Sequence, residues 1–322
     1  MRLFRIAALA GVGMLLASAA GAQPLGLATS GPGSLYHSIG TAIAKVANEH
    51  GLDMTVQPAT SPTQYMPAVN AGDFEFGIGN LQEFNYALEG KAWFGGVGAN
   101  PNLRVVALLY QLKEAIFVRK DSAITTIAEL KGKRMTAGFT AQKTILPQLD
   151  ALYATAGLTR NDVVKVEVPN VVAGANAFMA GQTDGFIFAQ GAAKVREADA
   201  SVGGIRALPI ANTPASLAAI RKHWPTGHLV PMKPGLADPG VLAPGYFIAY
   251  PMLVFTNKSV ADDAVYKLAK AIYESQKAMG QVFAPMKGFD PKRDMVGDTA
   301  PGRYHPGAIK FYKQVGLWKS PS

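Results

Sequence analysis

The sequence predicts an α/β protein of two lobes, each with a mixed sheet flanked by helices. Three observations favour this class. Short apolar segments with strand-like patterns recur along the 322-residue chain, helical patterns separate them, and glycine-rich turns join them. These β-α-β units also fall into two similar sets, one on each side of about residue 112. A chain of this length can bury one large or two modest cores.

The first 22 residues are expected to be a signal peptide and not a part of the fold. Arg2 and Arg5 precede an apolar run over residues 6–16, and the small residues 20–22 form a signal-peptidase site before Gln23. The run is shorter than the roughly 20 residues of a membrane-spanning helix. The sequence therefore predicts a periplasmic protein that begins near Gln23.

The composition limits the partners that we expect. The chain has 31 Lys and Arg against 22 Asp and Glu, and it has no Cys. The densest basic groups, at residues 131–134 and 292–293, are not interleaved with aromatic residues as in a nucleic-acid groove. We therefore expect no nucleic-acid partner, no disulfides and a monomer that is stabilised by its core.

The most informative stretch covers residues 25–44, LGLATSGPGSLYHSIGTAIA. It reads as a strand, a turn made flexible by Gly31 and Gly33, and a helix from near residue 35 with Ser30 or Ser34 as a cap. The amide groups and the dipole at the start of such a helix favour a bound anion. The alternative is an ordinary β-turn-α connection in which the serine only caps its helix.

The first set of units continues in the same manner. Its expected elements are a strand at 54–57, a helix capped by Ser61 or Thr63 and ending near residue 70, a strand at 74–80 and a buried strand at 105–110. The strand at 74–80 ends in Asn80, and its amide side chain should lie at the carboxyl end of the sheet.

The second set repeats this arrangement. Its expected elements are strands at 115–119, 134–139, 165–168 and 185–189, and helices at 124–130, from Thr140 to Gly157, and at 173–180. The last strand is followed by Gln190, which corresponds to Asn80 in the first set. Two generic helix-turn-strand units would give the same pattern, so the repeat is one of two interpretations.

The remaining chain suggests a return to the first lobe. Residues 214–251 are rich in Pro and Gly, residues 246–256 read as a long strand, residues 262–279 as a helix, and the segment after residue 305 as a turn with a short helix. Crossings near residues 112 and 250 would place 23–112 with 250–322 in lobe 1 and 113–249 in lobe 2.

No known catalytic motif accompanies these elements. The mature chain has no G-x-S-x-G, H-E-x-x-H or Walker sequence, and we expect no metal and no cofactor. Because His37 lies beside Ser34, an exported hydrolase that uses these two residues is kept as an alternative.

Residues 29–40, TSGPGSLYHSIG, together with residues 42–44 resemble the glycine-rich turn of the TAXI family, the extracytoplasmic substrate-binding proteins of a subclass of TRAP transporters. Weaker matches follow in the same order at 71–73, 127–134, 180–184 and 305–308. The resemblance covers nearly the whole mature chain. It implies a type II periplasmic-binding-protein fold with a hinge, an interlobe ligand cleft and delivery of a small organic anion to TRAP-type membrane permease subunits.

Two departures from the family bear on the ligand. His37 replaces the second tyrosine of the turn, and residues 139–144 are bulkier than the usual small turn of the second lobe. The expected ligand is an amino acid, a dicarboxylate, a 2-oxo acid or an aromatic acid. A protein that feeds a sensor instead of a permease is an alternative. The expected ligand contacts are Ser30, Gly31, Gly33, Ser34, Tyr36, His37, Asn80, Thr140, Gln142, Lys143, Thr144 and Gln190.

Overall fold

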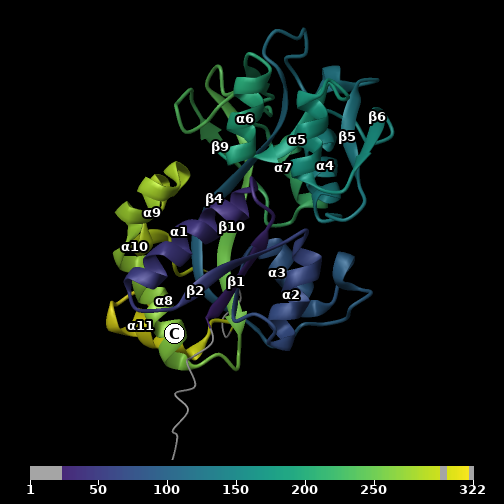
Figure 1. The fold of residues 1–322 in the computed structure, drawn as a ribbon. Helices are drawn as coiled ribbons and strands as arrows, with labels where there is room; N and C mark the ends of the chain where they lie inside the picture. The colour runs from purple at the N-terminus through teal and green to yellow at the C-terminus, as the bar shows by residue number, and fades with distance from the viewer. Residues whose placement is uncertain (1–23, 298–302, 319–322) are drawn as a thin grey trace, which may run out of the picture.

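The computed structural model describes residues 24–297 and 303–318, so the predicted signal peptide lies outside the described residues. Figure 1 shows two lobes, one above the other, connected by the long strands β4 (Leu103–Arg119) and β10 (Gly245–Asn257). The strands pair in the order β2-β1-β3-β10-β4-β7-β5-β6, with β8 beside β4 and β9 beside β10. The predicted α/β class is confirmed. The two expected sheets form one, because β4 and β10 belong to both.

The first lobe contains the parallel strands β1 (Leu25–Ser30), β2 (Met54–Ala59) and β3 (Phe76–Asn80). Its helices are α1 (Leu35–Glu49), α2 (Pro62–Ala71), α3 (Leu81–Glu89), α8 (Asp262–Glu274), α9 (Gln276–Val282), α10 (Pro291–Asp294) and α11 (Pro306–Gln314). On α1, the fully buried residues Ile39, Ile43 and Val46 follow helical spacing and form the face that packs on β1, β2 and β3.

The second lobe contains β5 (Arg134–Phe139), β6 (Val164–Val168) and β7 (Gly185–Ala189), which pair in parallel. Its other elements are α4 (Ile145–Ala154), α5 (Val171–Met179), α6 (Ala193–Ser201), β8 (Ile205–Ala207), α7 (Pro214–His223) and β9 (His228–Met232). The sequence did not predict α6, α7, β8 and β9, nor α3 and α10 in the first lobe. The strands at the centre of each lobe were predicted.

The expected strands at 105–110 and 115–119 are one continuous strand, β4. The residues between them, 111–114, three of which are polar, stay extended because β10 runs antiparallel beside them, with Tyr250 opposite Leu112 and Pro251 opposite Gln111. This pairing lies at the passage from one lobe to the other. Cross-strand hydrogen bonding overrides the weak local strand pattern of these residues.

Three predicted helices differ from the observed ones. The helix expected at 262–279 is interrupted at Ser275, which separates α8 from α9. The helix expected at 124–130 is only a 3-10 turn, Ala128–Leu130, because the Glu129 carboxylate accepts the amides of Thr125 and Thr126. The helix expected from Thr140 begins five residues later, at Ile145, because the amides of residues 140–142 donate to the carbonyls of Val168 and Pro169.

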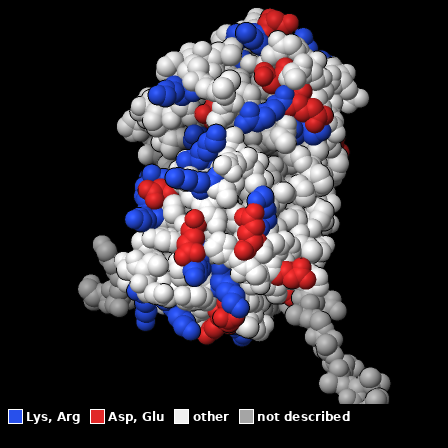
Figure 2. Space-filling view, turned by 60° about the vertical axis from the view of Figure 1, so that its left-hand side comes forward, with Lys and Arg blue, Asp and Glu red and all other residues white. Residues whose placement is uncertain are grey.

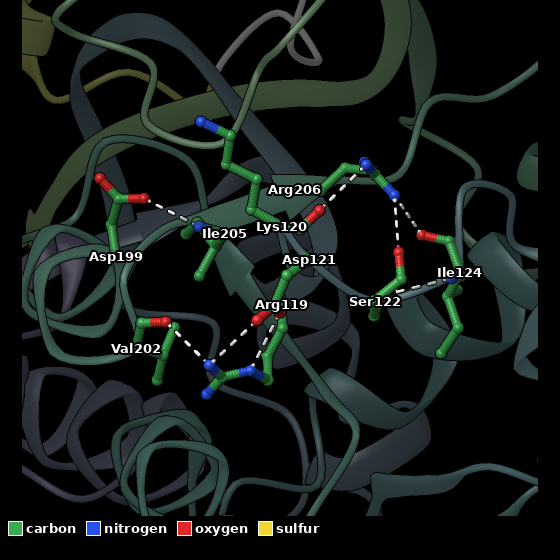
Figure 3. A network of polar contacts seen from close by, with 9 residues as sticks. All are labelled: Arg119, Lys120, Asp121, Ser122, Ile124, Asp199, Val202, Ile205 and Arg206. Atoms are coloured by element: carbon green, nitrogen blue, oxygen red, sulfur yellow. Dashed lines mark hydrogen bonds and ion pairs between the residues drawn. The ribbon is translucent and has the colours of Figure 1, made fainter.

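Polar contacts fasten the outer end of β4 to β8 (Figure 3). The Arg206 guanidinium donates to the carbonyls of Lys120, Ser122 and Ile124 at 3.0, 3.3 and 2.8 Å, and Arg119 donates to the Val202 carbonyl at 3.1 Å. These bonds provide hydrogen-bond donors for backbone carbonyls in and near the turn that follows β4.

Charged side chains of both signs are interspersed over the face in Figure 2, which agrees with the thin spread of positive charge in the sequence. Within the described ranges, no helix has both the length and the apolar composition required to cross a membrane.

Candidate functional site

A small cavity of about 40 Å³ lies where the two lobes meet. The first lobe contributes the end of β1, the start of α1 and the start of α3, and the second lobe contributes α4, α5 and the end of β7. The connecting strands β4 and β10 contribute Glu114 and Tyr250. Parallel strands of each lobe therefore direct their carboxyl ends toward this place, which is the usual position of a ligand site in α/β proteins.

The wall formed by the first lobe is a short chain of hydrogen bonds. The Asn80 amide donates to the Tyr36 hydroxyl at 2.9 Å, and that hydroxyl donates to Glu83 Oε2 at 3.0 Å. Asn80 also caps α3, because its side-chain oxygen accepts the Glu83 backbone amide at 2.9 Å. The cap fixes the first turn of α3 and holds the Glu83 carboxyl group against the cavity.

A second tyrosine and glutamate face the first pair. The Tyr250 hydroxyl on β10 donates to Glu114 Oε2 on β4 at 3.0 Å. Gln148 of α4 lies beside them, and with its amide oriented to satisfy both of its polar atoms the nitrogen donates to the two Glu114 oxygens at 2.9 and 2.7 Å. Glu114 is thus bound by neutral donors.

Both carboxyl groups are buried, and this changes their titration. Burial raises the pKa of Glu83 to about 7, against the lowering effect of the nearby Thr144 and Tyr36 hydroxyls. Burial raises the pKa of Glu114 to about 8, with Tyr250 lowering it and the charge of Glu83 raising it further. Among the described residues that line the cavity there is no Lys, Arg or His. The two acids therefore line the same cavity without a counter-charge among the described lining residues.

The start of α1 is close to the sequence prediction. Ser34 is the N-cap and accepts the His37 backbone amide at 3.1 Å, and Gly33 has a φ of +87°, as a flexible turn glycine requires. Ser30 also lines the cavity, is only 5% exposed, and its hydroxyl has no hydrogen-bond partner within the described chain. The Tyr65 hydroxyl lies nearby but donates to the Ile78 carbonyl.

The predicted site residues are divided among three places. Ser30, Ser34, Tyr36 and Gln142 line the cavity. Gly33, His37 and Gln190 line a larger open groove of about 1190 Å³, which we call the outer groove and which also contains Lys113, Arg196 and Lys287. Gly31, Asn80, Thr140, Lys143 and Thr144 line neither space.

Some of these residues still contact the site indirectly. Asn80 acts through Tyr36, and Thr144 lies near Glu83. By contrast, Thr140 and Lys143 are exposed, so the positive charge of Lys143 is not inside the cavity. The expected correspondence of Asn80 and Gln190 is limited, because the Gln190 amide donates to the Pro239 carbonyl at 2.7 Å and lines the outer groove.

The cavity residues that sequence reasoning missed are Glu83, Glu114, Gln148 and Tyr250. Two signals were present. Asn80 followed three residues later by Glu83 is a capping-box pattern, and Glu114 is a charged residue that directly precedes the apolar run 115–118. Neither signal indicates that the two acids meet, since that depends on the pairing of distant elements.

The hydrolase alternative gains no support from the geometry. Ser34 is engaged by the backbone amide of His37, while His37 Nδ1 lies 3.3 Å from the Thr29 hydroxyl. Burial lowers the pKa of His37. A catalytic triad requires a carboxylate that orients the histidine, whereas the neighbour of His37 Nδ1 is the Thr29 hydroxyl. Within the described residues, no group of three or more His, Cys, Asp or Glu could hold a metal ion.

The fold is similar to that of several solved proteins. A periplasmic transporter has a TM-score of 0.55 with 14% identity, over 91% of this chain and 92% of that one. PhnD1 of Prochlorococcus marinus, in complex with methylphosphonate, has a TM-score of 0.52 with 10% identity, over 91% and 98% of the two chains. A protein of Bordetella bronchiseptica has a TM-score of 0.52 with 16% identity, over 92% and 89%.

At these identities the likeness concerns the fold, which is the two-domain α/β fold of periplasmic binding proteins. The family follows from a match between the sequence and a family model. A model of the NMT1-like family matches residues 27–316, which is most of the chain and includes every element of the cavity. The protein belongs to the NMT1-like family.

Proposed function

We propose that the protein is an extracytoplasmic solute receptor that captures a small organic acid between its lobes and delivers it to a membrane permease. The observation that carries this proposal is the cavity between the lobes, where buried polar side chains from both lobes surround a space that includes the unpartnered Ser30 hydroxyl. The binding-protein fold and the methylphosphonate bound by PhnD1 support a small anionic ligand.

The ligand acid group is proposed to bind at the start of α1. The amide groups after Ser34 and the positive end of the helix dipole favour a carboxylate there. Gln142 lies across the cavity and can donate to the same ligand. No bound metal is needed in this arrangement.

Capture is proposed to involve a hinge. A cavity of about 40 Å³ has room for only a few water molecules, so a ligand enters only when the lobes separate. Separation about β4 and β10 would break few polar contacts between the lobes, such as the bond from the Thr226 amide to Gln82 Oε1 at 3.2 Å. The proposed lobes are residues 23–112 with 250–322, and 113–249.

The partner is proposed to be a TRAP-type permease, on the basis of the resemblance of residues 29–40 to the TAXI turn. A permease of the ABC type and a signalling sensor are the competing partners. Reconstitution of the receptor with each permease class in vesicles, followed by uptake of the identified ligand, distinguishes them.

The ligand is sought first by a thermal-shift screen of organic acids and amino acids, with chelator present. A ligand at 100 times its Kd stabilises the native state by about 2.7 kcal/mol, which is readily detected. The expected result is a shift with a small acid, and absence of any shift or of any calorimetric binding across the panel would contradict a receptor role.

A further inference from the structure

Glu83 and Glu114 form an acidic pair that the first lobe and the hinge strand β4 bring to the same cavity. Each accepts a hydrogen bond from a tyrosine, Tyr36 in one case and Tyr250 in the other, both at 3.0 Å. Gln148 adds neutral donors to Glu114. Neutral donors hold the two carboxyl groups in place, but they supply no positive charge. A buried carboxylate without a cationic partner is unfavourable, so the two groups favour their neutral forms in the free protein and would ionise beside a bound cation.

The Ser30 hydroxyl is a second and independent sign of a missing partner. It lines the same cavity, is 5% exposed, and has no hydrogen-bond partner within the described chain. A buried hydroxyl in this condition loses free energy unless a water or a ligand bonds to it. Ser30 comes from β1, so it is not a member of the acidic pair.

We propose that Glu83, Glu114 and Ser30 bind a primary ammonium group of the transported solute. An ammonium group has three donors, and the cavity offers it two carboxyl groups and one hydroxyl as acceptors. The volume of about 40 Å³ between the closed lobes has room for such a group. The proposal rests on the proposed receptor function and narrows the ligand to acids or other solutes that carry a cationic nitrogen.

Tyr36 and Tyr250 are positioning residues in this site. Each directs one oxygen of its glutamate, and Asn80 in turn fixes the Tyr36 hydroxyl at 2.9 Å. Charge-assisted hydrogen bonds between an ammonium and two carboxylates are stronger than hydrogen bonds between neutral groups. The site therefore distinguishes an amine from a hydroxyl or a keto group at the same position.

Proton linkage gives the proposal a distinctive pH dependence. A bound ammonium favours the ionised form of both glutamates, so binding near neutral pH releases protons, and affinity rises from about pH 6 to about pH 8. The titratable groups that face the pair are Tyr36, Tyr65 and Tyr250. Their pKa values are raised well above 10, mainly by burial, so they stay neutral in this range.

The test is calorimetry with matched solutes, namely alanine and lactate, glutamate and 2-oxoglutarate, phenylalanine and phenyllactate, and ethanolamine and ethylene glycol. The variants are Glu83→Gln, Glu114→Gln and the double variant, with Glu89→Gln on the same helix as a surface control. Repetition in buffers of different ionisation enthalpy measures proton release, and chelator removes adventitious metal.

The expected result is that the amine member of the best pair binds at least about tenfold tighter, and that the double variant loses this preference while Glu89→Gln keeps it. Equal binding of both members, a preference that survives in the double variant, or affinity that falls as pH rises would overturn the ammonium site. These outcomes still leave a ligand-binding receptor. Absence of binding by every solute would instead contradict the proposed function.

Discussion

The backbone amide of Lys194 donates to the carbonyl of Gly33 at 3.2 Å. This bond joins the first turn of α6 in the second lobe to the turn before α1 in the first lobe. A Cβ atom added at Gly33 would also lie 3.3 Å from Lys194 Cε. The turn that precedes the candidate ligand site is thus also a point of contact between the lobes.

Gly33→Ala is expected to weaken ligand binding and to lower stability. The φ of +87° costs an L-residue about 1–2 kcal/mol, and the new methyl group presses on Lys194 in the closed state. Denaturant unfolding and calorimetry with the identified ligand measure the two effects.

Gly51→Ala is the matched control for this change. Gly51 has a similar φ of +79°, but no atom lies within 4 Å of an added Cβ. The control should lose stability without losing affinity. Equal loss of affinity in both variants would mean that the contact between Gly33 and Lys194 does not contribute to ligand binding.

Ser34→Ala is expected to reduce both stability and affinity. Loss of the N-cap bond to His37 costs about 0.5–2 kcal/mol, and loosening of the first turn of α1 disturbs the amides proposed to bind the ligand. Thr213→Ala removes the corresponding cap of α7, where Thr213 accepts the Ser216 amide at 3.1 Å away from the cavity lining. If both variants lose stability and neither loses affinity, Ser34 is only a helix cap.

The stability of the ligand-free protein is expected to fall as pH rises from about 5 to about 8. The pKa values of Glu83 and Glu114 are raised to about 7 and about 8, so over this window the folded state binds more protons than the unfolded state. The contribution of these groups to stability is therefore complete below their unfolded pKa values, near 4.3, and is lost as pH rises through the folded values.

Urea unfolding at several pH values measures this slope. Glu83→Gln and Glu114→Gln should each flatten it and raise stability near pH 8, because the neutral amide needs no ionisation in a buried site. Glu89→Gln should keep the slope of the natural protein. A slope unchanged in the double variant would mean that other groups control this titration.

The local features of the fold could be predicted from the sequence because short-range patterns determine them. The helix that follows Ser34 and the strands β5 and β7 have the predicted bounds or lie within a residue of them. The approach of Glu83 to Glu114 could not be predicted, since it depends on α3 and on the pairing of β4 with β10. The pKa shifts depend on the same tertiary burial, which one sequence does not specify.

The groups that meet in the cavity, and so the class of ligand, also depend on tertiary contacts. The sequence points to a helix start that favours anions, and Lys143 was among the expected ligand contacts, yet the structure places Lys143 in solvent and two acids in the cavity. A ligand with both an acid group and an ammonium would use both features.

Ligand binding is expected to make the protein more compact, because the lobes must separate to admit a solute and close to surround it. Gln82 is 4% exposed, directly precedes Glu83 in the chain, and accepts the Thr226 amide of the second lobe at 3.2 Å. Gln82→Ala removes this bond, so the ligand-free variant should favour the open form and have a larger radius of gyration than the natural protein. Small-angle scattering with and without ligand measures both states, and Gln57→Ala on exposed β2 is the control. A radius that does not change with ligand in either protein would contradict hinge closure about β4 and β10.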